Sequence, residues 1–253
     1  MKLSQQNIRI GTSNIVIPGS RDSFPAPYNL KSRLHYYAFF FDTVEINQTF
    51  YKLPRAATFE RWAGEVGDAF QFTLKLSRDI THFKHLKGDL AFLDNFLYAA
   101  DTLKEKKGCL LLQFPGKITL EYFNEVEAIL QKATSADEHS QWKVAVELRH
   151  LSWHTGETYE LLNSFGATLV MQDKPASKMM EQVTNAPLVY MRLHGPLGDY
   201  RGSYTDEFLK QQADRIIQLA AEGKTVYLYF NNTIGNAFNN AITLTGMIYS
   251  DYS

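Results

Sequence analysis

The sequence predicts an α/β fold, a single (β/α)8 TIM-type barrel with a shortened sixth helix that uses residues 1–253 as one domain. Short β-prone runs alternate with helix-prone segments along the whole chain, which favours parallel strands joined by helical crossovers. Eight such units are present, the first begins on a strand and the last ends on a helix, and polar residues recur where the strands end. An open doubly wound sheet is the alternative, but no Gly-x-Gly-x-x-Gly pattern follows the first strand.

Eight runs rich in apolar, β-branched and aromatic residues are the expected strands. They are Ile8–Gly11, Thr43–Asn47, Phe70–Leu76, Cys109–Phe114, Lys143–Leu148, Ala167–Met171, Leu188–Leu193 and Val226–Phe230.

The segments between these strands have helical character. We expect helices at Leu30–Phe40, Thr58–Val66, Leu90–Lys106, Leu120–Lys132, Thr158–Phe165, Asp206–Ala221 and Asn236–Tyr249. Thr205 is a predicted N-cap, and Gly108, Gly166 and Gly223 stand where helices should end. Only about 15 residues separate Asp173 from Leu188, so the sixth helix is expected to shrink to a turn around Lys178–Gln182.

Composition narrows the class of protein without naming a reaction. The chain has 26 basic and 27 acidic residues, so its bulk charge of -1 gives no reason to expect nucleic acid or an anionic membrane as partner. Its one cysteine, Cys109, excludes an internal disulfide and a multi-cysteine metal site. No apolar run approaches the ~18 residues that a membrane span needs, and the first residues are polar. We therefore expect a cytoplasmic globular protein.

Polar side chains stand at the end of almost every predicted strand, where a barrel of this kind builds its active site. Because side chains alternate along a strand, Glu147 with Arg149 and Arg192 with His194 should share a face. The predicted catalytic residues are Glu45, Glu147, His194 and Lys75, and the predicted ligand-binding residues are Asn47, Tyr51, His82, Gln113, Arg149, Asp173, Arg192, Tyr229, Asn231 and Asn232. Glu and Arg can also pair across strands for purely structural reasons.

The cations of this set favour a small anionic or polar ligand, because guanidinium groups match carboxylate and phosphate oxygens. Lys75, Arg149 and Arg192 are the expected anion clamp, and His194 is the expected proton shuttle. We predict an enzyme that acts on an anionic, phosphorylated or sugar-like ligand. No cofactor is strongly implied and no metal ligands are assigned.

Other reaction classes stay open at this point. Glu45 with Glu147 is the one glutamate pair available to a retaining glycosidase, and Lys75 could form a Schiff base. A divalent metal bound among the acidic residues and histidines would give a metal-dependent phosphoester hydrolase. A nucleic-acid-binding module is a further alternative, in which loop tyrosines such as Tyr51, Tyr200 and Tyr204 stack bases.

Several motifs resemble those of the YecE-like family, domain of unknown function family seventy-two. They are Ile10-Gly11-Thr12-Ser13, Val44-Glu45-Ile46-Asn47, Thr49-Phe50-Tyr51, Ile80-Thr81-His82, Gln113-Phe114-Pro115, Glu147-Leu148-Arg149-His150, Arg192-Leu193-His194-Gly195 and Phe230-Asn231-Asn232. The resemblance runs from Ile8 to Leu244 and implies a TIM-type barrel, but it brings no established reaction. The chain departs from the family pattern at Asn14–Gly19 and at Thr233.

Overall fold

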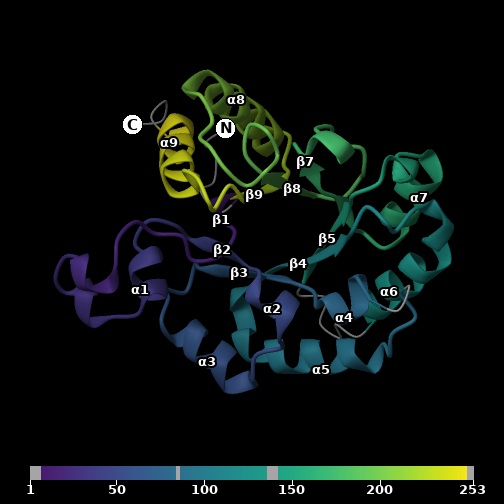
Figure 1. Cartoon of the computed structure of the whole chain (residues 1–253), viewed down its shortest axis with the longest axis horizontal. Helices are drawn as coiled ribbons and strands as arrows, with labels where there is room; N and C mark the ends of the chain where they lie inside the picture. The colour runs from purple at the N-terminus through teal and green to yellow at the C-terminus, as the bar shows by residue number, and fades with distance from the viewer. Residues whose placement is uncertain (1–6, 84–85, 136–141, 250–253) are drawn as a thin grey trace. The chain divides into compact units, whose positions relative to one another are not determined.

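The computed structural model describes residues 7–83, 86–135 and 142–249. Its helices and strands form a mixed α/β fold with two parallel sheets, labelled in Figure 1. The chain folds into two compact units. Unit 1 comprises the described residues of Met1–Glu45, Met171–Met180 and Pro187–Ser253, and unit 2 comprises those of Ile46–Val170 and Glu181–Ala186. That the chain is a single domain stays a prediction.

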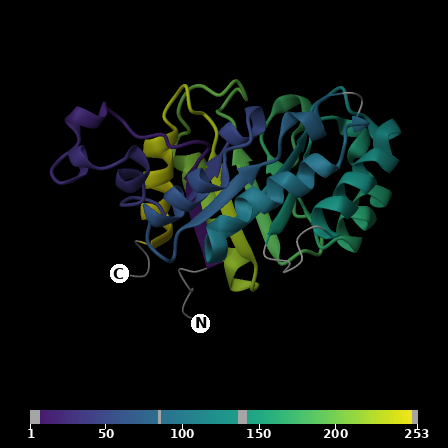
Figure 2. The ribbon, with the colours of Figure 1, turned by 90° about the horizontal axis from the view of Figure 1, so that it is seen from below.

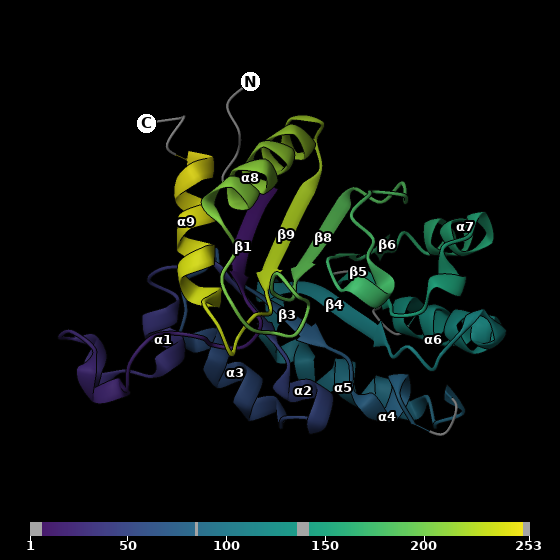
Figure 3. The ribbon, with the colours of Figure 1, turned by 45° about the horizontal axis from the view of Figure 1, so that its top comes forward.

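Unit 1 is built on a four-stranded sheet with the order β1-β9-β8-β7. These strands are β1 (Ile8–Thr12), β9 (Thr225–Phe230), β8 (Leu188–Leu193) and β7 (Met171–Gln172), and the helices are α1 (Arg33–Tyr37), α8 (Asp206–Ala221) and α9 (Ala237–Tyr249). Figure 3 shows β1, β9 and β8 side by side, with α8 and α9 beside them. The apolar stripes of the two helices, among them Ile216 and Leu244, are buried there.

The second sheet has the order β2-β3-β4-β5-β6. Its strands are β2 (Thr43–Ile46), within which the chain passes from unit 1 to unit 2, and β3 (Gln71–Lys75), β4 (Lys107–Phe114), β5 (Lys143–Leu148) and β6 (Thr168–Leu169). The helices of unit 2 are α2 (Gln48–Tyr51), α3 (Ala56–Gly64), α4 (Arg78–Thr81), α5 (Ala91–Ala100), α6 (Phe123–Ser135) and α7 (Gly156–Ser164), coloured blue to teal in Figure 2. Strand β4 is buried along its whole length, as expected for a central strand of a parallel sheet.

The strand order confirms the predicted fold class. Two predicted strands, Lys143–Leu148 and Leu188–Leu193, match β5 and β8 residue for residue. The predicted sixth strand is present as β6 and β7, interrupted at Val170, and β6 pairs with β5 while β7 pairs with β8. In unit 1 an isolated parallel bridge also joins Ser13 to Glu45. The order of the strands is thus the one that a TIM-type (β/α)8 barrel uses.

The structure corrects the predicted sixth crossover in its details. The crossover is short, as expected, but its single turn is a 3-10 helix at Pro175–Ser177, where a proline occupies the first turn. The predicted turn at Lys178–Gln182 is wrong, because Met179 instead forms an antiparallel bridge to Gln172. The hydrogen bond from the Met179 backbone N–H to the Gln172 carbonyl is 2.9 Å long.

Helix ends also differ from several predictions. The helix expected at Leu30–Phe40 covers only Arg33–Tyr37, because the Ser32 side chain accepts a hydrogen bond from the His35 N–H and fixes the start. The Thr205 cap is confirmed by its bond to the Phe208 N–H. Gly166 and Gly223 follow helix ends with positive φ, whereas Gly108 lies inside β4 and the prediction for it is wrong. No helix in the described part of the chain is long and apolar enough to cross a membrane.

Candidate functional site

The most deeply buried charges of unit 1 are Glu45, at the end of β2, and Arg192, on β8. The Arg192 guanidinium contacts both carboxylate oxygens, with Nη2 to Oε1 at 2.8 Å and Nε to Oε2 at 2.9 Å. Tyr190 and Ser13 complete the set: their hydroxyls donate to Oε2 at 2.5 Å and to Oε1 at 2.7 Å. Four donors therefore hold one carboxylate in a fixed position.

This arrangement stabilises the ionised form of Glu45. Burial alone would raise its pKa, but the charge of Arg192 and the hydrogen bonds from Arg192, Tyr190 and Ser13 lower it below its ordinary value. A carboxylate that is fully buried and held this way is a poor proton donor at neutral pH. The geometry thus gives Glu45 and Arg192 the structural role that a buried ion pair can have, and their predicted catalytic and clamp roles stay predictions.

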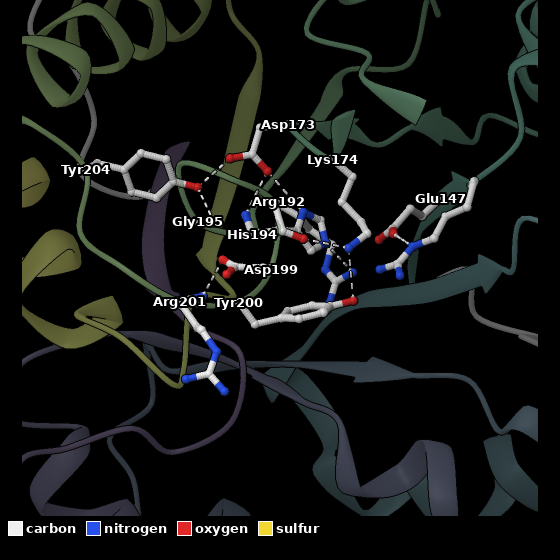
Figure 4. Close-up of polar contacts among 12 residues, drawn as sticks. Glu147, Asp173, Lys174, Arg192, His194, Gly195, Asp199, Tyr200, Arg201 and Tyr204 are labelled. Carbon is white, nitrogen blue, oxygen red and sulfur yellow. Dashed lines mark hydrogen bonds and ion pairs between the residues drawn. The ribbon is translucent and has the colours of Figure 1, made fainter. Parts of the chain in front are cut away.

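A second set of contacts in unit 1 surrounds Asp173, which follows β7, and His194, which follows β8. One oxygen of Asp173 accepts from the His194 backbone N–H at 2.7 Å and lies 3.1 Å from its Nδ1. The other accepts from the Tyr204 hydroxyl, which in turn accepts from the Gly195 N–H at 2.5 Å (Figure 4). Burial, and then the charge of Asp173 and its hydrogen bond, raise the pKa of Tyr204, so the phenol stays protonated and donates.

His194 joins these two sets. Its Nε2 lies 3.3 Å from Nη1 of Arg192, and because a guanidinium can only donate, this nitrogen accepts. The proton of the neutral ring is then on Nδ1, where it is directed at Asp173. The shared face predicted for Arg192 and His194 is confirmed. His194 is fully buried with a partner at each ring nitrogen, so its predicted role as a proton shuttle has no support in these contacts.

The remaining unit 1 residues of the predicted set, Tyr229, Asn231 and Asn232, are all buried. Lys174, which follows Asp173 but lies outside the predicted set, donates to the Gly198 carbonyl at 2.8 Å, and its ammonium lies 4.4 Å from the centre of the Tyr200 ring. The side-chain amide of Asn232 donates to the Gly202 carbonyl and to Oδ1 of Asn240, both at 3.0 Å. Tyr229 is fully buried, with its hydroxyl 2.6 Å from that of Thr43, and its ligand-binding role stays a prediction.

Unit 2 carries the other half of the predicted residues, most of them at or after the carboxyl ends of β3, β4 and β5. Lys75 ends β3, and its ammonium lies 4.1 Å from the centre of the Phe50 ring. His82 packs edge-on against the same ring, with centroids 4.7 Å apart. Its Nε2 is 3.5 Å from the Gln113 amide nitrogen at the end of β4, and its Nδ1 is 2.8 Å from the Thr81 hydroxyl.

At the end of β5, Arg149 and Glu147 share a face, as predicted. Nε of Arg149 donates to Oε1 of Glu147 at 2.5 Å, and this carboxylate is fully buried while 17% of the arginine side chain is exposed. Lys75, His82, Gln113, Glu147 and Arg149 are named here the strand-end cluster of unit 2. Asn47 is the residue before α2, and Tyr51, which ends this helix, is 64% exposed.

Burial and the charges of the strand-end cluster lower the pKa of His82. Its pKa falls to about 4, first because the ring is partly buried and then because Lys75, Arg149 and Lys117 repel a proton, with a smaller opposing effect from Glu147. His82 is therefore neutral at pH 7. The cations outweigh the carboxylate at this position, which makes it a favourable place for an anion.

The sequence assigns no metal ligands but allows a divalent metal among its acidic residues and histidines. Across residues 7–83, 86–135 and 142–249, no three or more His, Cys, Asp or Glu side chains are grouped so that they could hold a metal ion. The Glu45 carboxylate is instead bonded to Arg192 and Tyr190, and the Asp173 carboxylate is bonded to Tyr204.

A family model described as "Protein of unknown function DUF72" matches residues 9–252. The chain belongs to this family. It is 24% identical over 270 residues to the UPF0759 protein YunF of Bacillus subtilis (strain 168), a match that covers 93% of each protein. A DUF72 family protein from Thermotoga maritima MSB8 matches in structure with a TM-score of 0.76 and 26% identity, over 95% of this chain and 98% of that one.

Another DUF72 structure, from Enterococcus faecalis V583, gives a TM-score of 0.78 at 22% identity and covers 95% of both chains. Enzymes outside DUF72 share the fold at lower similarity. A sugar phosphate isomerase/epimerase from Parabacteroides distasonis ATCC 8503 has a TM-score of 0.55 at 13% identity, and an AP endonuclease of family 2 from Brucella melitensis has 0.53 at 12%. They cover 97% and 96% of this chain, and 96% and 99% of their own.

Sequence reasoning missed several residues that complete these sets. Tyr190 stands two positions before Arg192, so the alternation that paired Arg192 with His194 also places Tyr190 on that face. Phe50, which lies in the Thr49-Phe50-Tyr51 motif, contacts both Lys75 and His82. Tyr204 was considered for base stacking, but it is buried against Phe208 and bound to Asp173, so that interpretation is wrong. No local pattern predicts these partners, since they lie far apart in the sequence.

Proposed function

We propose that this DUF72 protein is an enzyme that acts on a small ligand with a phosphate or carboxylate group, bound at the strand-end cluster of unit 2. The observation that carries the proposal is that Lys75 and His82 share the Phe50 ring at the end of β3, while Gln113 and Arg149 stand at the ends of the neighbouring parallel strands β4 and β5. Open and closed parallel α/β sheets place their ligands at these ends.

The roles within the cluster follow from the chemistry of each side chain. Lys75 and Arg149 bind the anionic group, because an ammonium and a guanidinium supply charge-assisted donors. The Gln113 amide, close to His82, orients polar groups of the ligand. Glu147, held in place by Arg149, and the neutral His82 are the candidate acid-base groups, so proton transfer is the class of reaction that the cluster supports.

Glu45 and His194 have no part in this proposed chemistry. Both are fully buried in unit 1. The Glu45 carboxylate is hydrogen-bonded to Arg192, Tyr190 and Ser13, and the His194 ring contacts Arg192 and Asp173. The similarity to sugar-phosphate and DNA-processing enzymes supports the fold. A phosphorylated sugar is one ligand that meets the requirement for an anionic group.

The test is a ligand-induced melting shift with inorganic phosphate and a panel of sugar phosphates. Wild type is compared with Lys75→Ala and Arg149→Ala, and with Lys210→Ala as the control, because Lys210 is an exposed residue of α8 in unit 1. We expect stabilisation of wild type and of the control that grows with ligand concentration, and its loss in the two cluster variants. Equal shifts in all four proteins would reject the proposed site.

A further inference from the structure

Next to the strand-end cluster, unit 2 exposes two aromatic rings with an arginine between them. Tyr51 is 64% exposed and Phe83 is 43% exposed. The Arg78 guanidinium lies 5.5 Å from the centre of the Tyr51 ring and 5.3 Å from that of Phe83. We name these three residues the aromatic ledge. Large apolar side chains exposed together at a ligand-binding end of a sheet usually mark a contact surface.

The ledge is held on two short helices that sequence reasoning did not predict. Tyr51 is the last residue of α2 and Arg78 the first residue of α4. Ser77 caps α4 by accepting from the Asp79 N–H at 3.2 Å, and Thr49 donates to the Lys75 carbonyl at 2.7 Å. These contacts fix the backbone on both sides, so Tyr51 and Arg78 are presented from anchored positions.

Phe50 joins the ledge to the strand-end cluster. Its ring meets Tyr51 edge-on, with centroids 5.0 Å apart, and it also contacts His82 and lies under the Lys75 ammonium. The buried Phe50 ring thus contacts the exposed Tyr51 ring on one side and the Lys75 ammonium and His82 on the other. A ligand that spans them needs a flat apolar part at Tyr51 and an anionic part at Lys75.

Building on the proposed function, we propose that the aromatic ledge stacks a nucleobase, and that the ligand of the strand-end cluster is a nucleotide. A base offers the flat π-face that an aromatic platform recognises, and its phosphate offers the charge that Lys75 and Arg149 attract. The Arg78 guanidinium, 5.5 Å from the centre of the Tyr51 ring, adds a cation–π contact to this platform. An apolar protein segment would not benefit from these cations.

The experiment is a calorimetric titration with adenosine 5′-monophosphate, ribose 5-phosphate, adenosine and a short single-stranded oligonucleotide. Four proteins are compared: wild type, Tyr51→Ala, Tyr51→Phe and Tyr98→Ala. Tyr98 is the matched control, because it is 82% exposed on α5 of the same unit. In wild type we expect the nucleotide to bind at least about tenfold more tightly than ribose 5-phosphate, the gain that one stacked base gives.

The expected pattern is loss of this preference in Tyr51→Ala and its retention in Tyr51→Phe and Tyr98→Ala. Tighter binding of the oligonucleotide, with affinity that falls steeply as salt rises, would identify a polynucleotide as the source of the base. Equal affinity of wild type for the nucleotide and for ribose 5-phosphate, or an unchanged preference in Tyr51→Ala, would overturn the ledge assignment while leaving the anion site intact. Binding of adenosine that depends on Tyr51, without any effect of the phosphate, would instead support the ledge and reject the anion site. No binding of any of the four would reject both.

Discussion

The guanidinium of Arg192 donates hydrogen bonds to both carboxylate oxygens of Glu45, at 2.8 and 2.9 Å, and neither side chain is more than 1% exposed. Removing a charge from water is costly, so each member of the pair depends on the other. In unit 1 this pair, extended through His194 to Asp173, connects the ends of β2, β8 and β7.

Replacing Arg192 should leave a buried, unpaired carboxylate. We expect Arg192→Met to lower the free energy of unfolding by about 3–5 kcal/mol, measured by urea denaturation. Lys210→Ala, which breaks an exposed helix pair with Asp214, should cost less than about 0.5 kcal/mol. The double variant Glu45→Gln/Arg192→Met should recover part of the loss, because the unpaired charge is gone. A loss below about 1 kcal/mol for Arg192→Met would contradict a buried pair.

The lowered pKa of Glu45 predicts a pH dependence of stability. A carboxyl whose pKa is lower in the folded than in the unfolded state stabilises the fold at pH values above its ordinary pKa of 4.5. This contribution disappears as the pH falls through the folded-state pKa. The free energy of unfolding should be measured from about pH 6 down to about pH 3, a range that spans the ordinary glutamate pKa. It should fall more steeply with decreasing pH for wild type than for Glu45→Gln. Identical slopes in the two proteins would show that the carboxyl is not stabilised by its partners.

Tyr204 should act as the support for Asp173. Its hydroxyl donates to Asp173 and accepts from the Gly195 N–H, so Tyr204→Phe leaves one acceptor and one donor without this partner. We expect a loss of about 1–3 kcal/mol in unfolding free energy. Tyr98→Phe, on an exposed ring, is the control and should change nothing measurable. If the two variants are equally stable, the Tyr204 contact is not structural.

Gly235 should be intolerant of any side chain. A Cβ at this position would lie 2.3 Å from the Gly202 carbonyl oxygen and 2.5 Å from its nitrogen, so backbone would have to move. We expect Gly235→Ala to destabilise by about 1–3 kcal/mol. Gly246→Ala, in α9 with nothing within 4 Å of the new Cβ, should stabilise by about 0.5–1 kcal/mol. A thermal melt that ranks the two variants in the opposite order would contradict the close packing of the Gly202 and Gly235 loops.

Most of the fold was predictable because each strand carries its own local signal. The apolar run Lys143–Leu148 and the capped, amphipathic Asp206–Ala221 were predicted to the residue. The helices α2 and α4 were not, since four residues such as Gln48–Tyr51 carry no periodic pattern. Alternation also placed Glu147 beside Arg149, but it could not show that Tyr229 bonds Thr43 or that Tyr204 bonds Asp173, because these pairs form only through tertiary packing.

The measurement that tests the proposed anion site most directly is an NMR titration of His82, with and without inorganic phosphate. Burial and the charges of Lys75, Arg149 and Lys117 place the pKa of His82 at about 4. An anion bound to these cations cancels part of their repulsion, so saturating phosphate should raise the His82 pKa in wild type. This increase should be absent in Arg149→Ala. A His82 pKa near its ordinary value of 6.5 that phosphate does not change would contradict an anion site at the ends of β3, β4 and β5.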